Sequence, residues 1–194
     1  MAVLAACGGN EAADGTTTTT APPATTATTE ATTTSTTTAP TLPTPTTTYA
    51  QADDPPELLQ TGEDFRAIVE SVLAFSEWLG VHPDPSLVAT YAKEGSTAWQ
   101  RTSDLMSALA ENELHADGVD PAYMTDSRVI DRPTDQLVVV YVAAVNPAYD
   151  LLRADGSTAE SFEATPETGF AWHLERQPDG RWLLTQRDEL GIAE

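Results

Sequence analysis

The C-terminal part of the chain opens with a helical pattern of apolar positions. Between residues 65 and 79 apolar side chains recur every three or four positions, which places them on one helix face. Thr61 and Asp64 form a cap-like start before this run, and Gly80 ends it. Phe75 and Trp78 widen the apolar face, so the sequence predicts a helix covered on more than one side. The face itself comprises Phe65, Ile68, Val69, Val72, Leu73 and Leu79.

Two further helices are predicted before the pattern changes. After a proline-containing break, Ser86 caps a predicted short helix, Leu87–Glu94, which Gly95 closes. A third helix is predicted from about Thr97 to Leu114, and it stops near Asp117-Gly118. Its apolar residues are Trp99, Leu105, Met106 and Leu109.

Beyond residue 118 the hydrophobic period changes from about 3.6 residues to 2, which predicts strands. Ala154-Asp155-Gly156 and Gln177-Pro178-Asp179-Gly180 have the chemistry of tight turns, because Pro presets φ and Gly accepts positive φ. Helices followed by an antiparallel meander indicate an α+β domain, with the helices packed on one face of a curved sheet. The predicted strands are Tyr123–Ile130, Gln136–Asn146, Ala148–Arg153, Ser157–Ala164, Gly169–Gln177 and Arg181–Asp188.

One predicted strand departs from alternation. Leu137–Val145 is apolar at nine successive positions, whereas an antiparallel strand covered by helices on one side alternates apolar and polar residues. Both faces of this strand are therefore predicted to be buried. Either the N-terminal helix or the segment before it covers the second face, or a second copy of the chain does so in a homodimer.

Two segments carry a resemblance to a known family. The segment Asp84–Gly95, as the second of three helices, and the strand entry Asp179-Gly180-Arg181-Trp182 at the end of the meander resemble the NTF2-like (SnoaL-like) superfamily. More narrowly, the chain is similar to actinobacterial lipoproteins that carry such a domain on a Thr-rich stalk. The resemblance covers about residues 60–190. It implies an NTF2-like cone, with three N-terminal helices packed on a curved antiparallel sheet and a cavity between them that is catalytic, binds a ligand or is filled by side chains.

Composition divides the chain into three parts. Residues 16–48 hold twenty Thr, five Pro and five Ala, with Leu42 as the single large apolar residue. Such a segment cannot bury enough apolar surface to offset the entropy of ordering its backbone. We therefore predict a signal-peptide remnant, lipobox and tail over 1–15, and a disordered stalk over 16–51. The rest, 52–194, has the usual size of one globular domain.

Charge excludes one class of partner. The formal net charge is −21, and residues 1–51 carry three acidic and no basic residues, which leaves −18 for the domain. Nucleic acid is excluded as a partner, because its binding requires clustered Lys and Arg. An anionic membrane surface would also repel the domain. The membrane contact that we predict runs through a lipid anchor instead.

That anchor is predicted at Cys7, the only cysteine. Leu4-Ala5-Ala6-Cys7-Gly8-Gly9 resembles the bacterial lipobox, in which small residues precede a cysteine whose thiolate takes a diacylglyceryl group. Two acyl chains hold a protein at a membrane, whereas one holds it only marginally. A secretory signal also needs a charged segment and an apolar stretch of about 7–15 residues, so we expect a start upstream of Met1 or a truncated sequence. The expected location is the extracytoplasmic face of the cell membrane.

The domain contains few candidates for chemistry. His82, His115 and His173 show no metal-binding spacing, and no phosphate loop, dinucleotide fingerprint or nucleophile elbow is present. We therefore predict no metal, no cofactor and no catalytic residue. Enzymes of the superfamily place Asp, Tyr or His in the cone, and the matching residue types here are Tyr91, Tyr123, Tyr141 and Asp126. The predicted cavity walls are Tyr91, Trp99 and Trp172.

Two functions follow as hypotheses. The first is a noncatalytic cell-envelope domain that binds a protein or a small apolar ligand. The second is a small cofactor-independent isomerase or dehydratase that acts in the cone. An open pocket that holds a buried carboxyl or tyrosine with a perturbed pKa favours the enzyme, whereas a cone filled by Trp and Leu argues against it.

Overall fold

The computed structural model describes residues 49–192, and the helix predicted at the start of the domain is present as α1 (Phe65–Val81). It begins after Asp64, whose Oδ1 accepts a hydrogen bond at 3.1 Å from the Ala67 N–H. This bond satisfies one of the first-turn amides, which have no partner within a helix. The predicted apolar face of α1 is buried, with Val69 and Leu79 at 0% exposed.

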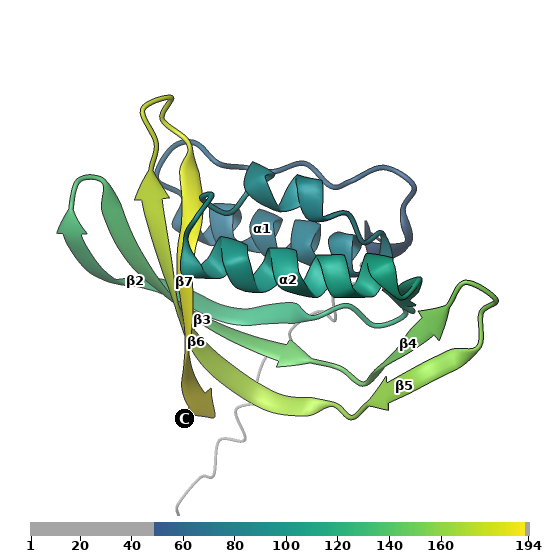
Figure 1. Ribbon diagram of the computed structural model, residues 1–194. Coiled ribbons are helices and arrows are strands. Elements are labelled where there is room, and N and C mark those ends of the chain that lie inside the picture. The colour runs from purple at the N-terminus through teal and green to yellow at the C-terminus, as the bar shows by residue number, and fades with distance from the viewer. Residues whose placement is uncertain (1–48, 193–194) are drawn as a thin grey trace, which may run out of the picture. The chain divides into compact units, whose positions relative to one another are not determined.

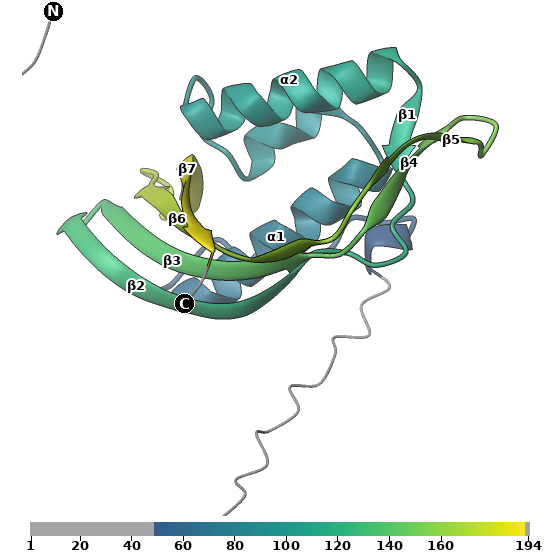
Figure 2. The same ribbon diagram turned by 90° about the horizontal axis from the view of Figure 1, so that it is seen from below.

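The second α-helix, α2 (Thr97–Glu111), lies with α1 on the concave side of the main sheet (Figures 1 and 2). The Oγ of Ser96 caps it by accepting a hydrogen bond at 3.2 Å from the Trp99 N–H. The helix ends three residues earlier than predicted. Glu113 has a φ of 53°, which turns the chain out of the helix and into the short strand β1 (Leu114–Ala116).

The predicted helix Leu87–Glu94 is present only in part, because the helical segment ends at Thr90. The structure has a 3-10 helix, η2 (Pro85–Thr90), which is capped by Asp84 rather than Ser86. The chain beyond Thr90 pairs with the sheet: Leu184 donates to the Tyr91 carbonyl at 2.9 Å, and Lys93 donates to the Leu184 carbonyl at 2.9 Å. The Tyr91 carbonyl and the Lys93 N–H are therefore bonded to Leu184 and cannot form the hydrogen bonds of a longer helix. The described residues therefore have two α-helices, not three, together with η2 and a 3-10 turn, η1 (Tyr49–Gln51).

The antiparallel sheet and the α+β class are confirmed. The main sheet has the strand order β2-β3-β6-β7, formed by β2 (Tyr123–Thr134), β3 (Leu137–Asn146), β6 (Thr165–Arg176) and β7 (Trp182–Ile192). The turn between β6 and β7 is the predicted one: Gly180 has a φ of 88°, and its N–H donates to the Gln177 carbonyl at 2.9 Å.

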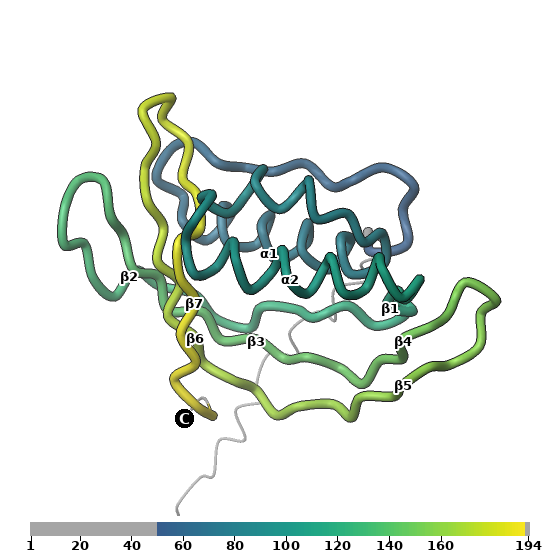
Figure 3. The backbone as a smooth tube through the Cα atoms, in the orientation of Figure 1, coloured from purple at the N-terminus to yellow at the C-terminus, as the bar shows by residue number. Residues whose placement is uncertain are grey.

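The single predicted meander is wrong, because the strands form two sheets. Strands β4 (Tyr149–Arg153) and β5 (Thr158–Phe162) form a hairpin that pairs with β1 in a second sheet of order β1-β4-β5. Pro147 lies between β3 and β4 and has no N–H to donate to a ladder, which separates the two sheets. The hairpin extends from the end of the main sheet opposite the β2–β3 turn (Figure 3).

Both faces of β3 are buried, as predicted from its composition. Val138, Val140 and Val142 belong to the core between the helices and the sheet. On the convex face Val139 and Ala143 are 7% and 2% exposed within the single chain. These residues therefore need no partner to be covered, and the homodimer stays a prediction.

Long side chains cover the convex face. The ring of Tyr141 lies against Gly169, where an added Cβ would be 3.0 Å from the Tyr141 Cε2 atom. The Arg128 guanidinium lies over the same ring, with its Cζ 4.3 Å from the ring centre. A glycine under an aromatic ring leaves no gap in the sheet surface.

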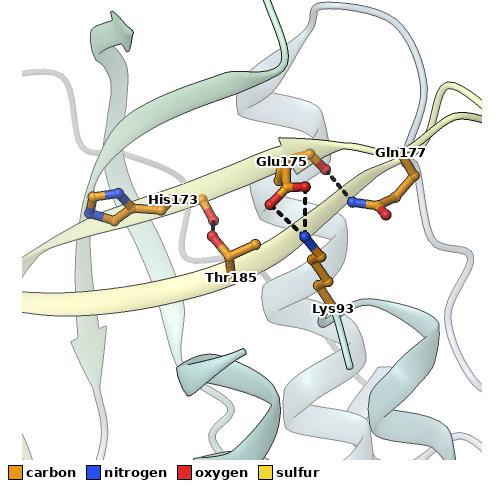
Figure 4. Close-up of polar contacts among 5 residues, drawn as sticks. All are labelled: Lys93, His173, Glu175, Gln177 and Thr185. Atoms are coloured by element: carbon orange, nitrogen blue, oxygen red, sulfur yellow. Dashed lines mark hydrogen bonds and ion pairs between the residues drawn. The ribbon is translucent and has the colours of Figure 1, made fainter. Parts of the chain in front are cut away.

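A cluster of polar contacts fixes the segment after η2 to the sheet (Figure 4). Lys93 Nζ contacts both carboxylate oxygens of Glu175 on β6, at 2.7 and 2.9 Å. Thr185 on β7 donates to the His173 carbonyl at 3.0 Å, and Gln177 donates to the Glu175 carbonyl at 3.1 Å. The ion pair is partly exposed and stabilises only modestly, but it fixes the position of the segment that carries Tyr91.

Residues on both sides of the predicted domain start at residue 52 are packed as well. Ala50 in η1 is 1% exposed, and Trp78 Nε1 donates to the Ala52 carbonyl at 2.8 Å. Within residues 49–192 none of the helices has the length and hydrophobicity that a membrane crossing requires.

Candidate functional site

A cavity of about 420 Å³ lies between α1, α2 and the strands β6 and β7. Four charged residues, Glu77, Arg101, Arg187 and Glu189, lie in its wall, which is otherwise mainly apolar. Small-molecule sites have this volume and this mixture of apolar surface with a few polar groups. The buried members of the wall are Val72, Tyr91, Ala98, Met106, Phe170, Trp172 and Leu184.

Tyr91 is the first of the predicted wall residues that lie at this cavity. It follows η2, is 2% exposed and packs edge-on against Phe75, with ring centres 5.7 Å apart. Burial raises the pKa of Tyr91 to about 12, and a hydrogen bond with Thr102 opposes this rise only in part. The phenol therefore stays protonated at neutral pH and is a donor at the cavity wall.

Trp172 on β6 is the second predicted residue in the wall. It is 3% exposed, and within residues 49–192 its indole Nε1 has no hydrogen-bond partner. An unpaired buried donor costs about 1–3 kcal/mol. Trp99, the third predicted residue, is not in the wall; it is half-buried and packs against the hydrophobic core. The roles of all three residues in ligand binding stay predictions.

Glu77 is a cavity residue that the sequence prediction missed. It lies on α1, one turn after the buried Leu73, and its Oε2 accepts a hydrogen bond at 3.0 Å from the Ala122 N–H. Burial raises the pKa of Glu77, although this hydrogen bond and the charge of Arg187 oppose the rise. Little in the sequence indicated this burial. Arg66 and Glu70 lie on the same side of the helix as Glu77, and both are exposed, so the pattern predicts an exposed Glu77 as well.

Arg187 was also missed, and its position depends on strand register. It lies on β7 directly opposite Trp172 on β6, and its Cζ is 4.2 Å from the centre of the Phe170 ring. The residue as a whole is exposed, yet its guanidinium packs over the cavity wall, and this partial burial lowers the pKa of Arg187. A β-bulge at Thr185 shifts the alternation of β7, so that Arg187 rather than Gln186 faces the cavity.

The other candidates lie elsewhere. Tyr123, Tyr141 and Asp126 are not in the cavity wall, and Asp126 forms an exposed ion pair with Arg128 at 2.7 Å. Of the histidines, His82 stacks on Trp78, His115 lies in β1, and His173 contacts Asp188 at 3.2 Å on the convex face. Among residues 49–192 there is no group of three His, Cys, Asp or Glu side chains that could hold a metal ion. Cys7 lies outside the described residues.

A second, more open depression of about 520 Å³ lies at the ends of α1 and α2. His82, Glu113 and His115 are the titratable residues in its wall. None of the unpaired buried polar side-chain atoms in the described part of the chain belongs to this wall. The depression is a surface hollow, and the cavity beside Trp172 is the better candidate for a ligand.

The raised pKa of Glu77 leads to a prediction about stability. A carboxyl whose pKa is raised on folding favours the fold when protonated, and this contribution is lost as pH rises through the folded-state pKa. Glu77→Gln should therefore unfold at higher denaturant concentration than wild type at pH 7, because the neutral amide keeps an acceptor for Ala122. The difference should close as pH falls below about 4.5, the ordinary pKa of the group.

Urea unfolding of both proteins across this pH range measures the effect. Glu70→Gln on the exposed side of α1 is the matched control and should show no such pH-dependent gain. A Glu77→Gln variant that is less stable than wild type at pH 7 would contradict the assigned direction of the shift.

Comparison with known proteins gives only distant similarities. No protein-family model and no curated protein matches the chain. Solved structures that resemble it include Aln2 from a Streptomyces species, with 14% identity over 69% of this chain and 93% of that one and a TM-score of 0.43. A protein from Catenulispora acidiphila has 14% identity over 66% and 94%, with a TM-score of 0.38.

A third similar structure is an NTF2-like protein with a cystatin-like fold from Novosphingobium aromaticivorans. It has 14% identity over 64% of this chain and 79% of that one, with a TM-score of 0.37. Similarity at this level assigns no activity to the chain.

Proposed function

We propose that this chain is a lipid-anchored cell-envelope protein whose domain, an NTF2-like cone, binds a small, largely apolar ligand. The observation that carries the proposal is the cavity of about 420 Å³ between the two α-helices and strands β6 and β7. Core side chains do not fill this space, although they fill the rest of the layer between the helices and the sheet. A small ligand fits it better than a protein partner, which would need a broad exposed surface.

The chemistry of the wall supports a ligand of mixed character. Phe170, Trp172 and Tyr91 offer aromatic surface, and the N–H of Trp172 has no partner within residues 49–192. Leu105, at 55% exposed, lies in the wall next to solvent and would be covered by a bound molecule. A small molecule with an apolar body would cover these apolar and aromatic groups.

The anchor and the location rest on the sequence alone. Cys7 in its lipobox-like context would carry the lipid, and the Thr-rich segment would separate the domain from the bilayer. The domain charge of −18 supports this arrangement, since an anionic bilayer surface repels it. The protein would then present its cavity on the extracytoplasmic side of the membrane.

A second candidate function has one observation in its favour. Glu77 is a carboxyl with a raised pKa in the cavity wall, and Tyr91 in the same wall stays protonated. This pair could act as base and acid in a cofactor-independent isomerisation or dehydration. Under both candidate functions, Glu77→Gln should still bind the ligand. If the protein is an enzyme, the same substitution should abolish turnover, because the amide cannot transfer a proton.

Filling the cavity tests the binding function. The neutral fluorophore N-phenyl-1-naphthylamine, whose emission rises in apolar surroundings, should bind the full chain. Ala98→Trp should reduce this binding strongly, because Ala98 is 6% exposed and lies in the cavity wall. Ala108→Trp, on the exposed side of the same helix, is the matched control and should bind as wild type does.

Both variants are first shown to unfold cooperatively. Equal fluorophore binding by wild type and a folded Ala98→Trp variant would contradict the proposed site. Absence of binding to wild type would contradict the proposed function itself.

A further inference from the structure

Two arginines that have no ion pair in the described part of the chain lie in the cavity wall. Four basic side chains elsewhere form ion pairs with carboxylates, those of Lys93, Arg128, Arg132 and Arg181. Within residues 49–192, Arg187 and Arg101 in the cavity wall form no ion pair and no hydrogen bond. Of the nine basic side chains, five lack a carboxylate partner among the described residues, and Arg101 and Arg187 are the two of these that lie at the cavity.

Arg187 stacks on an aromatic ring, and its guanidinium N–H groups donate no hydrogen bond within residues 49–192. Its Cζ lies 4.2 Å from the centre of the Phe170 ring and 6.0 Å from that of Trp172. A guanidinium stacked on aromatic rings keeps its in-plane N–H groups available, and their fork geometry suits a carboxylate.

The carboxylates near Arg187 do not satisfy it. Glu77 and Glu189 lie in the same wall and interact with its charge, but within the described part of the chain neither forms an ion pair with it. Glu77 is committed instead to the Ala122 N–H at 3.0 Å. Both carboxylates also disfavour a doubly charged group such as a phosphate monoester, because each added negative charge is repelled by them.

We infer that the ligand carries a single carboxylate, which binds the Arg187 guanidinium, while its apolar body packs against the apolar side chains of the cavity wall. The inference rests on the proposed function and adds a ligand class to it. Arg101, exposed on α2 at the same wall, contributes positive charge near the opening. The ligand class is a small carboxylic acid with an apolar body.

Two matched ligands test the inference in the full chain. 2-Naphthoate and its neutral analogue 2-naphthamide have nearly the same shape and differ in charge. By calorimetry at pH 7, wild type should bind the acid at least about tenfold more tightly, as expected for a charged hydrogen bond. Arg187→Met should remove this preference and lower the affinity for the amide much less than that for the acid, because the amide loses only a neutral acceptor contact and the methionine keeps apolar contact with Phe170.

Arg66→Met is the matched control. It removes the same charge from an exposed site on α1 that is not in the cavity wall, so it should keep the preference for the acid. The preference in wild type should also weaken at high salt, since Arg187 is partly exposed to solvent.

The possible results distinguish a failure of the carboxylate inference from a failure of the binding function. Equal affinity of wild type for acid and amide overturns the inference and leaves the binding function standing. Loss of both ligands in a folded Arg187→Met variant also overturns it, because Arg187 would then act through packing. Binding of neither ligand to wild type contradicts the binding function itself.

Discussion

Replacing Trp182 by alanine should lower the free energy of unfolding by about 3–5 kcal/mol, as large aromatic truncations in a core do. Trp182 is 1% exposed and packs edge-on against Phe65, with ring centres 5.1 Å apart. Its Nε1 donates to the Gly62 carbonyl at 2.9 Å, so the indole joins the start of β7 to the segment before α1. The alanine variant loses the ring, the hydrogen bond and the contact between these two segments.

Two further variants divide this effect. Trp182→Phe keeps an aromatic ring and should lose much less, because the hydrogen bond to Gly62 is the main contact removed. Trp99→Ala removes a half-buried ring and should also cost less than Trp182→Ala. Denaturant unfolding of the domain measures all three. A loss below about 1 kcal/mol for Trp182→Ala would mean that this ring does not hold the two segments together.

Replacing Cys7 by serine should release the protein from the membrane when the full gene is expressed in a bacterium that lipidates proteins. A serine hydroxyl is a poor replacement for the thiolate that takes the diacylglyceryl group, and without acyl chains nothing proposed here holds the protein at the bilayer. Wild type should partition into detergent, whereas Cys7→Ser should stay in the aqueous phase or accumulate unprocessed.

Intact mass provides the sharper measurement. The mature wild-type protein should begin at a Cys7 that carries a diacylglyceryl group. Ser35→Ala in the Thr-rich segment is a control that should leave this modification unchanged. An unmodified Cys7 in the mature protein, or cleavage at another position, would contradict the anchor.

Much of the fold was predictable because its signals are local. The apolar repeat of α1 and the turn at Gly180 depend on residues close in the chain, and both predictions are confirmed. The end of the segment Leu87–Glu94 was predicted wrongly because its backbone pairs with Leu184, about ninety residues later in the chain. The second sheet was missed for a similar reason, since β1 has only three residues and pairs with the distant β4.

The candidate site was less predictable than the fold. Tyr91 and Trp172 stand out in the sequence as large aromatic residues, and both lie at the cavity. Arg187 could not be found in this way, because it faces the cavity only through a bulge that no local pattern signals. Glu77 lies at the edge of the α1 apolar face, where burial depends on the position of Ala122 in another segment.

The indole N–H signals of the four tryptophans give the most direct test of the cavity as a ligand site. Nitrogen-15 NMR spectra of the full chain are recorded during titration with 2-naphthamide and, separately, 2-naphthoate, and Trp172→Phe identifies the Trp172 signal. The Trp172 signal should move, because its indole is part of the cavity wall and its N–H has no partner among the described residues. The signals of Trp78 and Trp182 should stay, since their N–H groups are bonded to the Ala52 and Gly62 carbonyls. A Trp172 signal that stays fixed through both titrations would contradict the account.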